Sequence, residues 1–199
     1  MILIGLTGSI AMGKSTVGAM FAAFGVPVFD SDSAVHAFYR SPEARQVEAE
    51  FPGVFRDGAI DRRKLADAVL GDDDAMARLE AIAHPRVEAA REEFVRQARA
   101  AGARQAVIDS PLLLETGAEG SVDIVIVVSA PLAVQKARAL ARPGMTQQRF
   151  ESILARQTSD RDKRRRAHFV IDTSSALAAT RAQARDILRC AAGMTGRNL

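Results

Sequence analysis

The amino-acid sequence predicts an α/β fold in which a five-stranded parallel sheet carries helices on both faces, and three observations support it. Short β-rich runs alternate with long helical patterns, as in a parallel sheet whose strands are joined by helices. Most of these runs are continuously apolar, which is typical of strands buried on both faces. A glycine-rich motif separates the first apolar run from the first helical pattern. The predicted strands are residues 2–6, 26–29, 105–109, 123–128 and 168–172.

The glycine-rich motif, residues 8–15, reads Gly-Ser-Ile-Ala-Met-Gly-Lys-Ser and fits the P-loop pattern G-x-x-x-x-G-K-S. Because a predicted strand precedes it and a predicted helix follows it, a P-loop is favoured over a chance turn with a solvated lysine. The backbone N–H groups of such a loop converge on phosphate, and the positive end of the following helix points to the same place. We expect Lys14 to reach the β- and γ-phosphates and the Ser15 hydroxyl to bind Mg²⁺. The predicted nucleoside triphosphate site comprises Gly8, Ser9, Ile10, Ala11, Met12, Gly13, Lys14, Ser15 and Thr16.

The composition is that of an ordinary globular protein, with 48% hydrophobic and 26% charged residues over 199 positions. This length suits one α/β domain with an inserted subdomain. The single cysteine, Cys190, excludes an internal disulfide and fits a reducing compartment. Because the first strand begins at Ile2 and no apolar run is long enough to cross a membrane, we expect neither a signal peptide nor a membrane partner. The protein is therefore predicted to be cytoplasmic.

Two segments are too long to be simple connections between strands. Residues 33–102 are predicted to form a helical insertion that caps the ligand-binding end of the sheet. Its helices begin at Asp61 and at about Asp74, and Pro85 should kink or break the second. Residues 142–166 form the second insertion, predicted as a lid, and residues 175–192 a closing helix that packs on the sheet. The whole chain, residues 1–199, is thus predicted as one domain.

Three aspartates follow predicted strands, at the edge of the sheet where open α/β proteins bind their ligands. Asp30 and Asp32 follow the second strand, where a carboxylate can orient or deprotonate an acceptor hydroxyl, or hold Mg²⁺. The alternative for both is that they cap the next helix. Asp109 ends the third strand in the position of a Walker-B-type acid, although an Asx turn before Pro111 explains it equally well.

Basic residues gather after the fourth strand. Arg138 and Arg142 share one face of a predicted helix, where they would stabilise charge during phosphoryl transfer or simply meet solvent. The run at 161–166 is better explained by a solvated lid helix closing over an anionic ligand than by a nucleic-acid patch, since the chain has no Trp and one Tyr for stacking. His84 is favoured as a packing or capping residue, and Cys190 as a small apolar filler.

These motifs, taken together and in order, resemble those of the dephospho-CoA kinase family along nearly the whole chain. The matching segments are residues 6–16, Asp30-Ser31-Asp32, His84-Pro85, residues 110–115, Gln135 with Arg138 and Arg142, and Arg156-Gln157. The chain departs from the family pattern at Ser9, Ala11, Met12, Leu114 and Asp172-Thr173. Glycine is usual at position 11, so that Ala11 would be strained if this position needs a positive φ.

The resemblance implies a P-loop kinase of the nucleoside-monophosphate-kinase type, which transfers the γ-phosphoryl group of ATP to the ribose 3′-hydroxyl of dephospho-CoA in the last step of coenzyme A synthesis. It implies that Asp32 acts as the base and that Ser15 and Asp32 bind Mg²⁺. Lys14, Arg138 and Arg142 would stabilise the transferring group.

The first insertion would bind the acceptor, and the lid would exclude water. One rival is another small P-loop kinase that acts on a nucleoside monophosphate or a small alcohol. The rival from another class is a nucleotide-gated RNA-binding module. We expect small-molecule substrates and no nucleic-acid partner, and the sequence leaves the oligomeric state open.

Overall fold

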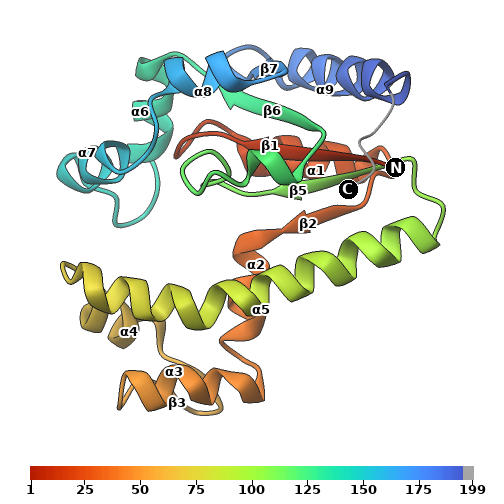
Figure 1. The fold of residues 1–199 in the computed structure, drawn as a ribbon. Coiled ribbons are helices and arrows are strands. Elements are labelled where there is room, and N and C mark those ends of the chain that lie inside the picture. Colours follow the sequence, from red (N-terminus) through yellow and green to blue (C-terminus); the bar gives the residue numbers. More distant parts are fainter. Residues whose placement is uncertain (195–199) are drawn as a thin grey trace. The chain divides into compact units, whose positions relative to one another are not determined.

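The computed structural model describes residues 1–194, which form two compact units. The first unit comprises Met1–Phe29 together with the chain from Ala98 onward, and the second is Asp30–Gln97. A five-stranded sheet of order β2-β5-β1-β6-β7 is the centre of the first unit (Figure 1). Its strands are β1 (Ile2–Thr7), β2 (Val28–Asp30), β5 (Gln105–Asp109), β6 (Ile124–Ser129) and β7 (Phe169–Asp172). All five predicted strands are confirmed, with differences only at their ends.

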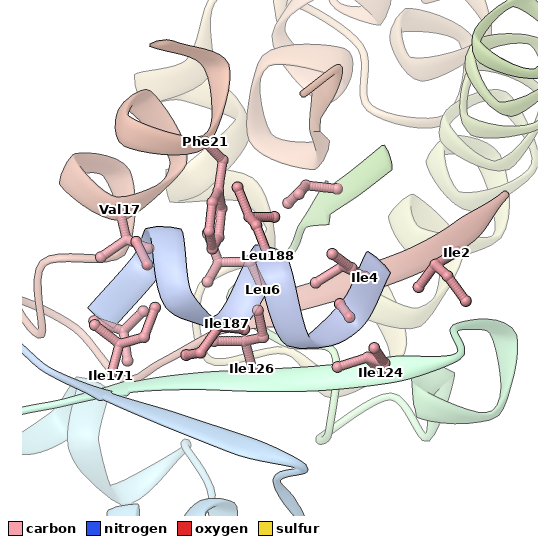
Figure 2. Packing of buried hydrophobic residues seen from close by; sticks show 14 of the residues in the cluster. Ile2, Ile4, Leu6, Val17, Phe21, Ile124, Ile126, Ile171, Ile187 and Leu188 are labelled. Atoms are coloured by element: carbon pink, nitrogen blue, oxygen red, sulfur yellow. The ribbon is translucent and has the colours of Figure 1, made fainter. Parts of the chain in front are cut away.

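The sheet is parallel where β1 meets β5 and β6, and where β6 meets β7. One of its faces is covered by α1 (Lys14–Ala23) and α9 (Leu177–Ala192), whose apolar residues share one buried cluster with Ile2, Ile4 and Leu6 of β1. Figure 2 shows Phe21 of α1 and Leu188 of α9 among these strand residues. Fully burying one such side chain contributes about 1.5–3 kcal/mol, so this interface anchors the helix that follows the P-loop.

The other face of the sheet is covered by the chain between β5 and β6 and by α8 (Asp160–Arg166). A methyl group at Gly5 would lie 2.5 Å from Leu113 Cδ2 and 3.0 Å from Val122 Cγ2, so this segment presses directly on β1. The helix α8 contacts β6, where the Ser129 hydroxyl donates to Asp160 Oδ2 at 2.9 Å. The prediction of helices on both faces is therefore confirmed.

The chain between β6 and β7 carries the remaining helices of this unit, α6 (Leu132–Leu140) and α7 (Gln147–Ala155). Gly144 has φ 72° in the turn between them, where a residue with a side chain would be strained. The segment predicted as a lid thus folds as two helices, α7 and α8, that follow α6 (Figure 1).

The second unit is mostly helical and has a core of its own. It contains α2 (Ser31–Phe38), α3 (Arg45–Glu50), α4 (Arg62–Val69) and most of α5 (Asp73–Ala100), with a small antiparallel pair, β3 (Phe55–Arg56) and β4 (Ala59–Ile60). Its buried apolar cluster includes Phe38, Phe51, Ile60, Leu65 and Leu79. The predicted helix start at Asp61 is confirmed, because the Asp61 carboxylate caps α4 by accepting from the N–H groups of Arg63 and Lys64.

Two expectations differ from the structure here. A break at Pro85, one of the two outcomes expected there, does not occur, since Pro85 lies inside the 28-residue helix α5. A proline in a helix costs about 3 kcal/mol, but Leu79 and Ala83 of the same helix are buried in the core of the second unit and stabilise the helical conformation. Cys190 is exposed on α9 and does not fill the core. Within residues 1–194, no helix combines the length and the apolar character needed to cross a membrane.

Candidate active site

The P-loop takes the backbone conformation that a phosphate-binding loop requires. Gly13 precedes α1 with φ 91°, and no side chain caps that helix, so its first N–H groups face outward as an anion site. A methyl group at Gly8 would lie 2.7 Å from the carbonyl oxygen of Val128, so only glycine fits where the loop leaves β1. The loop therefore depends on glycine at both of its ends.

Ala11 has φ 61°, so position 11 does need a left-handed backbone. A residue other than glycine in this region stores about 1–3 kcal/mol of strain and persists only where its surroundings hold it. The Ala11 methyl group is buried in a small apolar cluster with Ala139 of α6 and Phe150 of α7. The expected strain at Ala11 is therefore present, and helices of the lid region hold the strained residue in place.

Lys14 and Asp109 form an ion pair beside the first turn of α1. Both side chains are largely buried, with exposed fractions of 13% and 8%. The Asp109 carboxylate lies against this helix, since a methyl group at Gly18 would be 3.2 Å from Asp109 Oδ2. Asp109 thus occupies the position expected of a Walker-B-type acid, next to the P-loop lysine.

Arg138 is fixed beside the P-loop by the chain that follows β7. Its guanidinium group donates to Thr173 Oγ1 at 3.0 Å and to the Thr173 carbonyl oxygen at 2.6 Å. The Thr173 hydroxyl in turn donates to the carbonyl oxygen of Met12 at 2.7 Å. This network lies next to a cavity of about 400 Å³ lined by Ala11, Gly13, Thr16, Arg138, Arg142, Thr173, Ser175, Leu177 and Thr180.

The two aspartates after β2 belong to the second unit and differ in their environments. Asp30 caps α2, because its Oδ1 accepts from the N–H groups of Asp32 and Ser33 and its Oδ2 accepts from the Ser33 hydroxyl. The capping interpretation is therefore confirmed for Asp30. Asp32 is exposed in the first turn of α2 and lines a different cavity.

The cavity at Asp32 has a volume of about 470 Å³ and lies entirely within the second unit. Its polar lining includes Asp32, His36, Tyr39 and Arg62, and Leu65, Val69 and Leu79 are among its apolar lining residues. Burial raises the pKa of the Tyr39 hydroxyl, and the positive charge of Arg62 offsets this in part. The cavity therefore combines the carboxylate of Asp32, the cation of Arg62 and the protonated phenol of Tyr39 with apolar lining residues.

One residue of the basic helix α8, Lys163, is buried, whereas the other residues of the run 161–166 are exposed. Lys163 is fully buried, and its ammonium group contacts Glu115 Oε1 at 2.8 Å and the Pro111 carbonyl oxygen at 3.3 Å. Arg166 donates to the Leu114 carbonyl oxygen at 3.1 Å and pairs with Glu119. The prediction of a solvated helix over the run 161–166 is wrong for Lys163, because the loop after β5 offers it buried oxygen atoms that sequence spacing does not reveal.

Burial alone would raise the pKa of the Glu115 carboxyl, but three interactions outweigh it. Lys163 donates a hydrogen bond and supplies a positive charge, and the Thr158 N–H donates to Glu115 Oε1 at 2.9 Å. Together they hold the pKa of Glu115 below its usual range. The segment at 110–115 thus holds the end of the lid segment, a role that its sequence match did not indicate.

Two glutamines contact the P-loop backbone at one residue, Ile10. Gln157 Oε1 accepts from the Ile10 N–H at 3.0 Å, and Gln135 Nε2 donates to the Ile10 carbonyl oxygen at 2.8 Å. Both glutamines were expected only as members of a motif, without a function. The first unit therefore brings together the P-loop, Asp109, Arg138, Arg142 and both glutamines.

The surroundings of Ser15 suit a Mg²⁺ ion that arrives with a nucleotide. Ser15 is exposed in the first turn of α1, immediately after Lys14. Within residues 1–194, no group of three or more His, Cys, Asp or Glu side chains could hold a metal ion by itself. Mg²⁺ usually keeps several waters and takes phosphate oxygens with one or two protein ligands, which fits this sparse set of donors.

The chain matches known proteins over almost its whole length. The family model for dephospho-CoA kinase matches residues 2–179. A dephospho-CoA kinase from Mesorhizobium japonicum is 53% identical over 196 residues, which are 98% of this chain and 100% of that protein. The crystal structure of TT1252 from Thermus thermophilus has a TM-score of 0.86 at 32% identity and covers 98% of both chains.

A dephospho-CoA kinase from Campylobacter jejuni shares the fold, with a TM-score of 0.67 at 22% identity over 95% of this chain and 96% of that one. The family match extends across the P-loop, the cavity at Asp32 and both glutamines that contact Ile10. From the family model and the identity over the full length, the chain belongs to the dephospho-CoA kinase family.

Proposed function

We propose that this protein transfers the γ-phosphoryl group of ATP to the ribose 3′-hydroxyl of dephospho-CoA, giving CoA and ADP. The observation that carries the proposal is the P-loop, with its uncapped helix N-terminus and its paired lysine, in a chain of this family. Both substrates are small molecules, and we expect the reaction to take place in the cytoplasm.

The donor phosphates bind at the N-terminus of α1 in this proposal. The N–H groups there and the positive end of the helix attract the triphosphate. Lys14 leaves Asp109 for the β- and γ-phosphates when ATP binds, because a phosphate carries more negative charge than one carboxylate. Asp109 then remains beside α1 to accept hydrogen bonds from water on the nucleotide.

The base and ribose of ATP fit the cavity lined by Thr16, Arg138 and Thr173. Arg138 is held by Thr173 at the wall of this cavity, so its planar guanidinium group is already oriented when the nucleotide enters. Arg142 is exposed in the turn after α6, which ends at Leu140, and can turn toward the phosphates. We assign both arginines to stabilisation of the charge that develops during transfer.

Asp32 is the base for the acceptor in this proposal. Its carboxylate accepts the proton of the 3′-hydroxyl as the oxygen attacks the γ-phosphorus. The cavity that Asp32 lines supplies Arg62 for the phosphates of the acceptor, and His36 and Tyr39 as hydrogen-bonding groups. The apolar residues of this cavity suit the uncharged parts of the same molecule.

Ser15 and Asp32 are the proposed protein ligands of Mg²⁺. The Ser15 hydroxyl stands where the phosphates would arrive, and the Asp32 carboxylate supplies negative charge on the acceptor side. The ion, when bound, neutralises charge on the β- and γ-phosphates. The helices of the lid region exclude water from the reacting groups, which suppresses hydrolysis of ATP.

An acceptor panel tests the proposal. ADP release is measured with dephospho-CoA, with each nucleoside monophosphate and with small alcohols, at fixed ATP and Mg²⁺. We expect a clear preference for dephospho-CoA and a product that carries the new phosphate at the 3′ position. A preference for a nucleoside monophosphate would refute the proposed acceptor while leaving the donor site in place.

A further inference from the structure

Two glutamines hold the P-loop through both backbone polar groups of one residue, Ile10. Its N–H donates to Gln157 Oε1 at 3.0 Å, and its carbonyl oxygen accepts from Gln135 Nε2 at 2.8 Å. Gln135 is 2% exposed on α6, which precedes the lid, and Gln157 lies within the lid, between α7 and α8. A residue before the lid and a residue within it therefore meet at one P-loop residue.

The next residue, Ala11, explains why this contact matters. Ala11 holds a left-handed backbone with φ 61°, which an alanine leaves readily unless its neighbours prevent it. Its methyl group packs with Ala139 and Phe150, and the residue before it is held by both glutamines. The phosphate-binding shape of the loop is thus fixed by contacts from α6 and α7.

Gln157 is itself held firmly through its neighbour. The N–H of Thr158 donates to Glu115 Oε1 at 2.9 Å, and Glu115 is paired with the buried Lys163. Two consecutive residues, Gln157 and Thr158, are therefore bound to two different loops of the sheet. The segment between α7 and α8 is therefore bonded to the P-loop through Gln157 and to the loop after β5 through Thr158.

We propose that Gln135 and Gln157 are positioning residues for ATP, which hold the P-loop in its phosphate-binding shape through Ile10 and Ala11. Neither glutamine needs to touch the nucleotide in this mechanism. ATP binding and the arrangement of the lid are coupled in this proposal, because the hydrogen bonds of Gln135 and Gln157 with Ile10 connect the P-loop to α6 and to the lid. The proposal rests on the proposed use of ATP and goes beyond it by assigning these two side chains.

The orientation of each side-chain amide follows from its partner. An N–H can only donate, so Gln157 must present its oxygen; a carbonyl oxygen can only accept, so Gln135 must present its NH₂ group. Replacing each glutamine by glutamate therefore has opposite consequences. Gln157→Glu keeps an acceptor for the Ile10 N–H, whereas Gln135→Glu removes the donor and places a carboxylate against a carbonyl oxygen.

The experiment compares Gln135→Glu with Gln157→Glu in the full chain, using calorimetric titration with a non-hydrolysable ATP analogue and Mg²⁺. A lost hydrogen bond together with a repulsive contact corresponds to an affinity lower by about tenfold or more for Gln135→Glu. For Gln157→Glu we expect a change below about threefold, and for Gln157→Ala, which loses a hydrogen bond without adding a repulsive contact, a loss between those of the two glutamate variants. Equal effects of the two glutamate variants, or no effect of Gln135→Glu, would overturn the proposal.

A second arm separates positioning from simple support of the fold. Ala11→Gly removes the backbone strain that the glutamines hold, so it should restore part of the ATP affinity of Gln135→Glu when the two changes are combined. The KM for the acceptor should stay within about twofold in all these variants, since a residue that acts only on the P-loop affects binding of one substrate. A combined variant no better than Gln135→Glu, or equal losses for both substrates, would refute the assignment.

The outcome is independent of the acceptor. If wild-type protein binds the ATP analogue but does not phosphorylate dephospho-CoA, the proposed acceptor fails and the titration still decides the function of the glutamines. If wild-type protein is active and Gln135→Glu binds the analogue equally well, the positioning proposal alone fails.

Discussion

Replacing Lys163 by methionine tests whether the buried ion pair of α8 stabilises the fold. Lys163 is fully buried, and its partner Glu115 is 14% exposed, so the change leaves a carboxylate in a poorly solvated position without its cation. Breaking a buried pair in this way costs about 3–5 kcal/mol. For a chain of this length, 1 kcal/mol lowers Tm by about 2–4 °C. If the cost is about 3 kcal/mol, the lower end of that range, Tm should fall by about 6–12 °C.

The loss of stability in Lys163→Met should depend on pH, because Glu115 titrates differently in the two proteins. In the wild-type protein the pKa of Glu115 lies below its usual range, so its contribution is present above the unfolded-state pKa and is lost as the pH falls through the folded-state pKa. Without Lys163, the hydrogen bond and the positive charge that lower the pKa of Glu115 are lost, so this pKa is higher than in the wild type. Protonation then stabilises the variant as the pH falls, so the difference in Tm between wild type and variant should narrow from pH 7 toward about pH 4.

The matched control is Arg165→Met in the same helix. Arg165 is 64% exposed and lies 3.6 Å from Asp162, and exposed pairs of this kind contribute about 0–1 kcal/mol. Tm of the three proteins is measured by calorimetry or circular dichroism between pH 4 and pH 8. If Lys163→Met is no less stable than Arg165→Met at pH 7, or if the difference does not change with pH, the account of the buried pair is incorrect.

Three further predictions concern the active site. Asp32→Asn should leave binding of an ATP analogue nearly unchanged and lower turnover by about 100-fold or more, the usual size of general-base loss; unchanged turnover would remove Asp32 from the mechanism. Lys14→Ala should weaken nucleotide binding and slow the reaction, measured by titration and by ADP release, and wild-type values for both would contradict the P-loop assignment. Gly8→Ala should lower Tm and weaken ATP binding, because its methyl group would lie 2.7 Å from the Val128 carbonyl oxygen. Gly25→Ala is the control, since Gly25 has a positive φ but open space around it. Equal losses of stability and of ATP affinity in the two variants would argue against the steric explanation.

The sheet and the P-loop could be predicted because their signals are local. A continuously apolar run such as residues 105–109 needs no partner to be identified as a buried strand. The strain at Ala11 was expected on the condition that position 11 needs a positive φ, because the resembling family usually has glycine there, and its φ of 61° meets that condition. What depended on distant partners could not be predicted. The burial of Lys163 and the contacts of Gln135 and Gln157 with Ile10 join residues far apart in the chain.

The second unit was the least predictable part of the molecule, for two different reasons. The pair β3 and β4 has two residues in each strand, too few for a pattern, although Asp57-Gly58 is a recognised hairpin signal that could have revealed it. Pro85 was expected to kink or break α5 from its intrinsic propensity, and packing of neighbouring residues outweighed the tendency to break the helix. Local rules were sufficient at caps such as Asp61, where the stabilising contacts lie within one turn.

The separate core of the second unit has a consequence for how enzymes of this kind can be altered. The chain passes between the two units at only two places, after Phe29 and after Gln97. Apolar residues on each side of those places are buried among their own neighbours. In the proposed function, residues 30–97 bind the acceptor and the first unit binds ATP. Exchanging residues 30–97 as one segment is therefore expected to change the acceptor while the residues that bind ATP keep their own sequence.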